Sequence, residues 1–535
     1  STYSRWHPQN VGFPRHRLNM MDVLQSPSPA VVVAASFGFL YILYLLVQAT
    51  ITSHRRYLLS RKHGCKPVPS YPHKDPIFGL DVFLKNYKLS NTGGFLEDVK
   101  RKYEKVVGGY TFTQLLMGDR VILTAEPANI KAILATQFKD FMLPTRRKVA
   151  FQPVFGHGIF TTDGTEWEAS RALLRPNFTR SQVGDLDTFE VHITNMISKI
   201  PRDGSTVDLQ ALFFKLTMDS ATDFLFGYST DVLGNSGNSE AGQRFSDAFG
   251  YVTFRVGIEA RIGRLITILP DKKYQEGVKF IHQYVANYVQ KATSLHQQSL
   301  KDGKIGEEDE KAGKYVFLEH LAKTNYSERK IQDELLNILL AGRDTTASLL
   351  GYFFYILARR PDVAAKLREE ISKLGNARPS YEEIKSLKYL QYCLNETLRL
   401  HPIVPMNSRV AVRDTTIPVG GGPDGKSPVL VKKGQSVTYS AYVMQRRTDL
   451  YGEDALEFKP ERWEDLRPSW QYLPFNGGPR ICIGQQFALT EASYTVIRLL
   501  QSFSSIEKRD DSELLEHLTL TSAVRGGVNV GLTPA

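Results

Sequence analysis

The chain has 535 residues, of which 42% are hydrophobic and 23% charged, and its formal net charge is +11. This is an ordinary globular balance, without low-complexity linkers or solenoid repeats, so one large folded unit is expected behind a short N-terminal module. The basic charge is not arranged as Lys/Arg runs interleaved with aromatic residues. This argues against a nucleic-acid partner and favours anionic lipid or an acidic protein.

An apolar run near the N-terminus predicts a transmembrane helix over residues 30–51, after an N-terminal tail of residues 1–29. About 20 apolar residues span the hydrocarbon core of a bilayer. A cleaved signal peptide and a buried core helix are the alternatives, but the run is long for a signal and no cleavage pattern follows it. Basic residues from His54 to Lys66 predict a cytosolic location for the rest of the chain. Residues before Met20 are expected to be an over-extended start.

Residues 52–75 are predicted to be a basic, proline-rich linker. Pro67, Pro69 and Pro72 stiffen an extended segment, which would act as a semi-rigid strut. The remaining residues, 76–535, are expected to form a single catalytic domain. Three cysteines are too few for a disulfide framework, so this domain is expected in a reducing compartment.

A long helix is predicted over residues 329–360, where apolar residues recur at helical spacing and Pro361 marks the end. Its centre reads AGRDTT, from Ala341 to Thr346. Glycine and threonine in a buried helix cost stability, and a threonine hydroxyl can bond to the carbonyl four residues earlier. The segment is either a tolerated defect or a groove in which Asp344 and Thr345 pass protons to a bound ligand.

A glycine-rich loop, FNGGPRICIG at residues 475–484, leads into a helical segment near the C-terminus. Cys482 would lie at the N-terminus of that helix, where the partial positive charge favours a thiolate. Such a thiolate can be the axial ligand of haem iron. A lone cysteine is more often a buried small residue, but the ten-residue pattern is much rarer than its cysteine.

Four motifs in this order resemble those of the cytochrome P450 family. The loop at 475–484 resembles its haem-binding signature, and AGRDTT resembles the oxygen-activating motif of its central helix. Two further segments, Glu396–Arg399 and Pro460–Trp463, match its Glu-x-x-Arg and Pro-Glu-Arg-aromatic motifs. The resemblance implies a mainly α fold with small β-sheets, and haem b whose iron is ligated by Cys482.

The resemblance also implies roles for residues outside the loop. Glu396, Arg399 and Arg462 would form a buried network that holds the scaffold of the haem loop. The remaining cofactor-binding residues would be Trp167, Arg171, Arg409, Phe475 and Arg480, the arginines as partners of the haem propionates. Gln445 departs from the pattern, because many relatives carry histidine there.

The implied activity is insertion of one oxygen atom from O₂ into a C–H bond of an apolar substrate, with Asp344 and Thr345 delivering protons. Electrons would come from a separate NADPH-dependent flavoprotein reductase, because the chain has no dinucleotide-binding motif. Its glycine-rich segment 420–425 is expected to be a turn. The enzyme would be a single-pass protein of the endoplasmic reticulum membrane.

Closer likeness points to the fungal branch that hydroxylates alkanes and fatty acids, typically at the terminal carbon. By that analogy residues 249–270 line the access channel, where Arg255 and Arg261 either bind a substrate carboxylate or face solvent and lipid headgroups. A tailoring enzyme of a fungal secondary-metabolite pathway is the main alternative. A haem-thiolate isomerase or dehydratase and a non-catalytic haem protein are more remote.

Overall fold

The computed structural model describes residues 29–106, 109–178, 186–234, 239–262, 270–301 and 316–535. The expected start at Met20, and residues 263–269 of the expected access segment, lie outside the described residues. The chain divides into an N-terminal unit that ends at Lys62 and a large unit from His63 to Ala535.

The N-terminal unit contains helix α1 (Pro29–His63), which is long and apolar enough to cross a membrane. None of its residues is buried, which does not fit a core helix. The helix continues past the predicted end at Ile51, so the first part of the predicted linker is helical and not extended. No glycine or proline interrupts residues 52–63, and Gly64, with a φ of 66°, follows the last helical residue.

The proline-rich segment is extended, as predicted, but it is also fixed to the large unit. The N–H of Lys66 donates to the carbonyl of Pro428 at 3.0 Å. Thr113 and the segment exchange two bonds of 2.8 Å, one to the carbonyl of Pro69 and one from the N–H of Tyr71. The segment is therefore a part of the folded body, which begins before the predicted boundary at residue 76.

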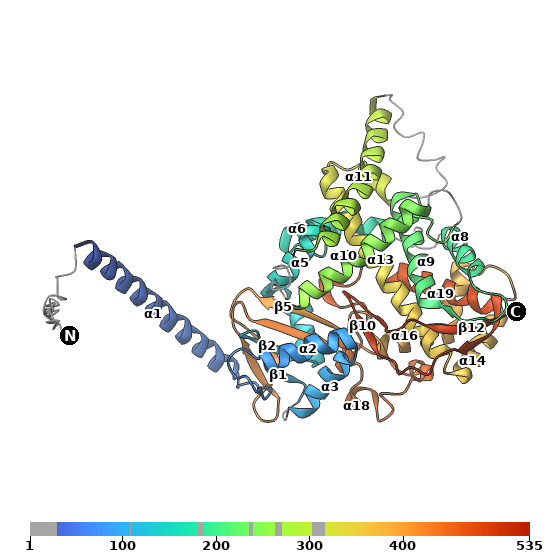
Figure 1. Cartoon of the computed structure of the whole chain (residues 1–535). Coiled ribbons are helices and arrows are strands. Elements are labelled where there is room, and N and C mark those ends of the chain that lie inside the picture. The colour runs from blue at the N-terminus through green and yellow to red at the C-terminus, as the bar shows by residue number, and fades with distance from the viewer. Residues whose placement is uncertain (1–28, 107–108, 179–185, 235–238, 263–269, 302–315) are drawn as a thin grey trace, which may run out of the picture. The chain divides into compact units, whose positions relative to one another are not determined.

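The large unit is mainly helical (Figure 1). Its helices are α2 (Leu80–Thr92), α3 (Phe95–Lys105), α4 (Pro127–Lys131), α5 (Thr145–Phe155), α6 (Gly164–Leu174), α8 (Leu186–Ser198), α9 (Leu209–Phe226), α10 (Ser239–Ile262), α11 (Lys272–Lys301), α12 (Phe317–Ala322), α13 (Glu328–Leu357), α14 (Pro361–Ser372), α15 (Tyr381–Ser386), α16 (Lys388–Leu400), α17 (Ala441–Met444), α18 (Thr448–Tyr451) and α19 (Gln485–Ser502).

Small sheets complete the fold, so the prediction of a mainly α protein with minor β structure is confirmed. The strands are β1 (Thr111–Leu116), β2 (Asp119–Thr124), β3 (Phe141–Met142), β4 (Val207–Asp208), β5 (Met406–Ala411), β6 (Thr415–Gly421), β7 (Ser427–Val431), β8 (Ser436–Ser440), β9 (Phe503–Lys508), β10 (Glu516–Leu518), β11 (Ser522–Val524) and β12 (Asn529–Pro534). The largest sheet has the order β1-β2-β8-β5-β3, and only its β2–β8 pair is parallel. The glycine-rich segment 420–425 forms the turn region of the β6–β7 hairpin, as expected.

Helix α13 is the central element of the core. The Ser327 hydroxyl caps its first turn by accepting a bond from the N–H of Lys330 at 3.3 Å. The helix runs without a break to Leu357 and ends just before Pro361 opens α14, close to the predicted bounds. It packs against α9, α11, α16 and α19, and nearly all of its residues are buried. The AGRDTT segment is therefore held inside the protein by helices on several sides.

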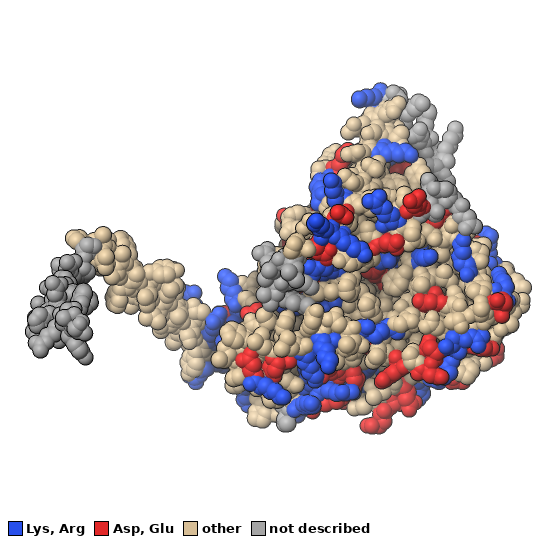
Figure 2. All heavy atoms as spheres, in the orientation of Figure 1, with Lys and Arg blue, Asp and Glu red and all other residues tan. Residues whose placement is uncertain are grey.

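Basic and acidic side chains are interspersed over the visible face of the large unit (Figure 2). Acidic side chains gather along the lower edge of that view. The basic surface expected for an acidic protein partner is therefore not a feature of this face.

Candidate active site

The cysteine loop, residues 475–484, is fixed by its backbone. Gly478 has a φ of 68°, and a Cβ atom there would lie 1.9 Å from the carbonyl oxygen of Leu134, so only glycine fits. The N–H of Cys482 donates to the carbonyl of Phe475 at 2.9 Å and closes the loop. These backbone contacts set the position of the cysteine side chain.

Cys482 lines a cavity of about 630 Å³. The other two cysteines lie elsewhere: Cys393 is buried in the helical core, and Cys65 follows α1. Neither of them is among the residues that line the cavity. Cys482 is therefore the thiol that can meet a ligand bound there.

Burial raises the pKa of the Cys482 thiol, while the N–H of Gly484 and the charge of Arg171 lower it. Helix α19 begins at Gln485, so the thiol lies just before its N-terminus, where the N–H of Gly484 favours the thiolate and burial opposes it. A bound metal ion would reverse the balance, because a coordinating thiol is deprotonated outright.

Of the arginines that line this cavity, four from distant parts of the chain lie close enough for their charges to interact, three of them predicted and one not. They are Arg171 on α6, Arg409 on β5, Arg480 in the cysteine loop and, missed by the sequence analysis, Arg147 on α5. Arg171 donates to the carbonyl of Ile481 at 2.9 Å, and Arg409 to that of Ser408 at 2.8 Å.

This arginine cluster carries more positive than negative charge. Among the described residues, Asp163 is the only carboxylate within ion-pair distance of the four, at 2.7 Å from Arg480, and it also pairs with Lys148. Burial and the charge of Arg409 lower the pKa of Arg147 to about 10, and its buried Nε has no partner in the described structure. A buried donor without a partner is costly, so the cluster fits an anionic ligand.

Trp167 and Phe475 provide aromatic walls. Trp167 is buried on α6, and the Arg480 guanidinium lies 4.4 Å from its ring centroid. Arg171 follows one helical turn later, and both side chains line the cavity together with Phe475. The structure thus brings every predicted cofactor-binding residue to one cavity.

On α13 the structure separates the two residues predicted to pass protons. Gly342, Thr345 and Thr346 line the cavity, and the Thr345 hydroxyl donates to the carbonyl of Ala341 at 2.6 Å. Asp344 is buried outside the cavity wall, where it pairs with Arg343 at 2.8 Å. Burial raises the pKa of Asp344 against the influence of that arginine. Asp344 can therefore act on the cavity only through neighbouring groups.

A second buried acid behind this helix was missed by the sequence analysis. Glu491 on α19 accepts a bond from the Ser220 hydroxyl. Burial raises its pKa to about 7, and the hydroxyls of Ser220 and Thr346 oppose the shift. Among the described residues no cation pairs with this carboxyl, and its pKa lies near neutral pH beside Thr346 of the cavity wall.

The family model described as cytochrome P450 matches residues 69–526 of the chain. The chain belongs to the cytochrome P450 family. Similar proteins include cytochrome P450 monooxygenase himC of Aspergillus japonicus, 45% identical over 96% of this chain and 92% of the relative. Cytochrome P450 monooxygenase FPY7 of Fusarium mangiferae is 44% identical (92% and 94%), and cytochrome P450 52A13 of Debaryomyces hansenii is 42% identical (88% and 92%).

As a cytochrome P450, the enzyme is a haem-thiolate monooxygenase that receives NADPH-derived electrons from a separate reductase. The residues of the cavity fit this cofactor. The cavity has one thiol in its wall, and its arginine cluster has the charge and the unpaired donor that two propionates would satisfy.

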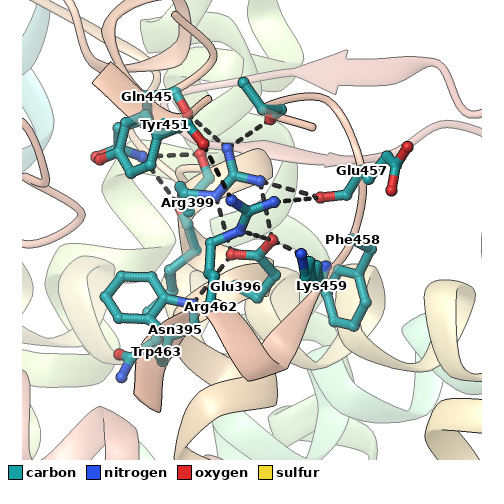
Figure 3. Close-up of polar contacts among 12 residues, drawn as sticks. Asn395, Glu396, Arg399, Gln445, Tyr451, Glu457, Phe458, Lys459, Arg462 and Trp463 are labelled. Carbon is teal, nitrogen blue, oxygen red and sulfur yellow. Dashed lines mark hydrogen bonds and ion pairs between the residues drawn. The ribbon is translucent and has the colours of Figure 1, made fainter. Parts of the chain in front are cut away.

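In this P450 the Glu396 carboxylate is the centre of a fully paired network (Figure 3). Arg399 donates to it twice, at 2.8 and 2.9 Å, and Arg462 donates at 2.8 Å. The indole of Trp463 and the backbone N–H of Lys459 add bonds of 3.0 and 2.9 Å. Arg399 also donates to the carbonyls of three other residues, Gln445, Ala455 and Glu457. The structure thus brings together the three predicted network residues.

Gln445 connects this network to the cysteine loop. Its amide donates to the carbonyls of Leu398 and Arg399, at 3.1 and 2.9 Å, and accepts a 2.8 Å bond from the N–H of Leu473. A neutral imidazole offers one donor and one acceptor, whereas the amide supplies two donors and an acceptor. The departure from histidine therefore preserves a tie between α16 and the segment that enters the loop.

Proposed function

We propose that this P450 hydroxylates long apolar chains, an alkane or a fatty acid, at the terminal carbon. The observation that carries the proposal is the cavity that contains Cys482. Beyond the arginine cluster its wall is mainly apolar, and it extends to α2, α3 and the end of α10. Apolar residues of these remote parts are Phe83, Phe95, Leu96, Val99 and Ile258, and Leu520 lies beside them in the cavity wall between β10 and β11. A long chain that fills such a cavity presents one end to the haem.

Cys482 is proposed as the axial ligand of the haem iron, and Arg171, Arg409 and Arg480, with Arg147, as the groups that hold the propionates. Bound haem supplies the activation of O₂ and the transfer of one oxygen atom. Trp167 and Phe475 exclude water beside it. The network of Glu396, Arg399 and Arg462 holds the scaffold of the cysteine loop.

Proton delivery is proposed to pass through the Thr345 hydroxyl, which lies in the cavity wall. Asp344 would supply protons to Thr345 from the side of α13 that faces away from the cavity. Its carboxyl is buried there and accepts a bond from Arg343. Substitution of Thr345 by alanine should then leave haem binding intact and divert electrons to peroxide. Unchanged coupling of NADPH to product would remove Thr345 from this role.

The enzyme is proposed to be a single-pass protein of the endoplasmic reticulum membrane with a cytosolic catalytic body and an NADPH-dependent flavoprotein partner. Residues 30–51 would span the membrane, preceded by the tail of residues 1–29. The apolar helix α1 and the basic residues that follow the span support this topology.

The test uses membranes that contain the protein, a eukaryotic NADPH-dependent reductase, a medium-chain fatty acid and an alkane of the same length. Mass spectrometry of the products locates the inserted oxygen, and terminal hydroxylation is the expected result. An intact thiolate-type carbon monoxide spectrum without product from either compound would contradict the proposal. That result would favour a specialised tailoring substrate.

A further inference from the structure

Three cations in the cavity wall lie outside the arginine cluster, namely Lys102, Arg146 and Arg261. Arg261, near the C-terminal end of α10, lines the same cavity as Cys482. Its guanidinium donates to the carbonyl of Thr519 at 2.5 Å and to that of Leu518 at 2.8 Å. Leu518 ends strand β10 and Thr519 begins the connection to β11, so Arg261 is held against this hairpin.

The backbone contact beside Arg261 is close. Gly257 lies one helical turn earlier on α10, and a Cβ atom there would lie 2.8 Å from the carbonyl carbon of Thr519. Helix α10 therefore packs directly on the hairpin, and the two elements position the guanidinium together. A side chain already fixed in this way loses little further freedom when it binds a ligand.

No acid in the described structure forms an ion pair with Arg261. Burial alone lowers its pKa to about 10. Burial lowers the pKa of His517 on β10 as well, and the charges of Arg525 and Arg261 add to that shift. The charges of Arg261 and Arg525 therefore both act on this hairpin.

Arg255, the other arginine of the expected access segment, differs from Arg261 both in its ion pairing and in its position relative to the cavity. It pairs with Asp271 at 3.2 Å and does not line the cavity. The two arginines lie on the same helix, but of the two only Arg261 lines the cavity, and no carboxylate of the described residues forms an ion pair with it.

We propose that Arg261 binds the carboxylate of a long-chain acid, so that the acid is preferred over the unsubstituted alkane. This inference rests on the proposed oxidation of long apolar chains. The two bonds to carbonyls use two of the five N–H donors of a guanidinium, and the others can form a charge-assisted pair with a carboxylate. With the carboxylate held at Arg261, the apolar chain lies along the cavity and its remote end is the part that reaches the haem.

The test is a spectral binding titration of the haem-loaded, full-length protein with dodecanoic acid, its methyl ester and dodecane. In the unmodified protein the acid should bind at least about tenfold more tightly than the ester, as expected for a charge-assisted hydrogen bond. Arg261→Gln should reduce this ratio to near one and leave ester binding unchanged. Arg261→Lys keeps the charge and should retain part of the preference.

Arg255→Gln is the matched control, and it should keep the acid-to-ester ratio of the unmodified protein. A ratio near one in the unmodified protein overturns the inference without any variant, and so does an equal weakening of acid and ester in Arg261→Gln. Both results leave the oxidation of long chains standing. If no long-chain compound perturbs the haem spectrum of the unmodified protein, the proposed function fails and the inference fails with it.

Discussion

Two groups of buried and half-buried arginines differ in how far carboxylates balance their positive charge. Around Glu396, Arg399 and Arg462 are matched by a carboxylate and by backbone carbonyls, and the Glu396 and Arg399 side chains are 0% exposed. In the cavity, four arginines share the single carboxylate of Asp163 with a lysine. The same residue type is thus fully satisfied in one region and left with excess charge in the other.

This difference in charge balance separates arginines that support the fold from arginines that can bind a ligand. A buried ion pair whose bonds are all made holds its surroundings in one arrangement and has no capacity left for a ligand. A group of cations that lower one another's pKa gains stability only when an anion arrives. Charge balance, more than burial or residue type, therefore distinguishes the scaffold of this P450 from its binding groups.

The largest effect is expected from Glu396→Gln, which removes the charge that balances two arginines. Leaving a buried cation unpaired costs about 3–5 kcal/mol of folding free energy. The yield of protein with a thiolate-type carbon monoxide spectrum should collapse, and the thermal midpoint of any remainder should fall. Glu461→Gln is the matched control, because that acid pairs with Lys366 at the surface and such pairs contribute about 0.5 kcal/mol. Equal effects of the two substitutions would contradict the distinction.

Glu491 extends the comparison to an acid that has hydroxyl partners and no cation. Its pKa rises from 4.5 to about 7, so the folded protein binds this proton more tightly than the unfolded chain. The resulting stability is complete below pH 4.5 and is lost as the pH rises through 7, a change of about 3 kcal/mol. Glu491→Gln should flatten the fall of the thermal midpoint between pH 5 and pH 8, taken as roughly the interval of that titration.

Glu190 provides a control for this measurement, because its pKa is shifted in the opposite direction to that of Glu491. Despite its burial, bonds from Tyr494 and Arg498 lower its pKa. Its stabilising effect is therefore present at neutral pH and lost as the solution becomes acidic. Glu190→Gln should destabilise the protein most at neutral pH. If both variants changed the pH profile in the same direction, the assignment of these two carboxyl groups would be wrong.

A smaller effect is expected from Arg147→Gln in the cavity. The substitution relieves repulsion within the cluster but removes one donor to the haem, so folding should be little affected while haem is held less tightly. Loss of one charged hydrogen bond should speed haem transfer to an excess of apomyoglobin by about tenfold. Arg101→Gln, at an exposed position of α3, should leave the transfer rate unchanged. An unchanged rate for Arg147→Gln would remove this residue from the binding groups.

Local sequence patterns predicted the central helix, whereas features that depend on long-range contacts were missed. Helical spacing and the stop at Pro361 are visible in the sequence, so the bounds of α13 were predicted closely. Arg147 belongs to no motif, and its contact with Asn407 joins segments that are far apart in the chain. Such a contact becomes visible only when β5 and α5 are placed together.

The different places of Asp344 and Thr345 were not predicted. The resemblance assigned the two residues a shared task, and of the two only the threonine lines the cavity in the structure. The helical extension of α1 to His63 was missed because the whole of residues 52–75 was predicted to be extended from prolines that lie only in its second half.

The network around Glu396 also has a consequence for the order of assembly. Its side chains all lie between Glu396 and Trp463, whereas the arginine cluster joins Arg147 to Arg480. Closing a short loop costs less entropy than closing a long one, and contacts of low sequence separation form sooner. The scaffold can therefore be complete before the cysteine loop meets the N-terminal half of the body. We therefore expect haem capture late in folding, when both halves are in place to enclose the cofactor.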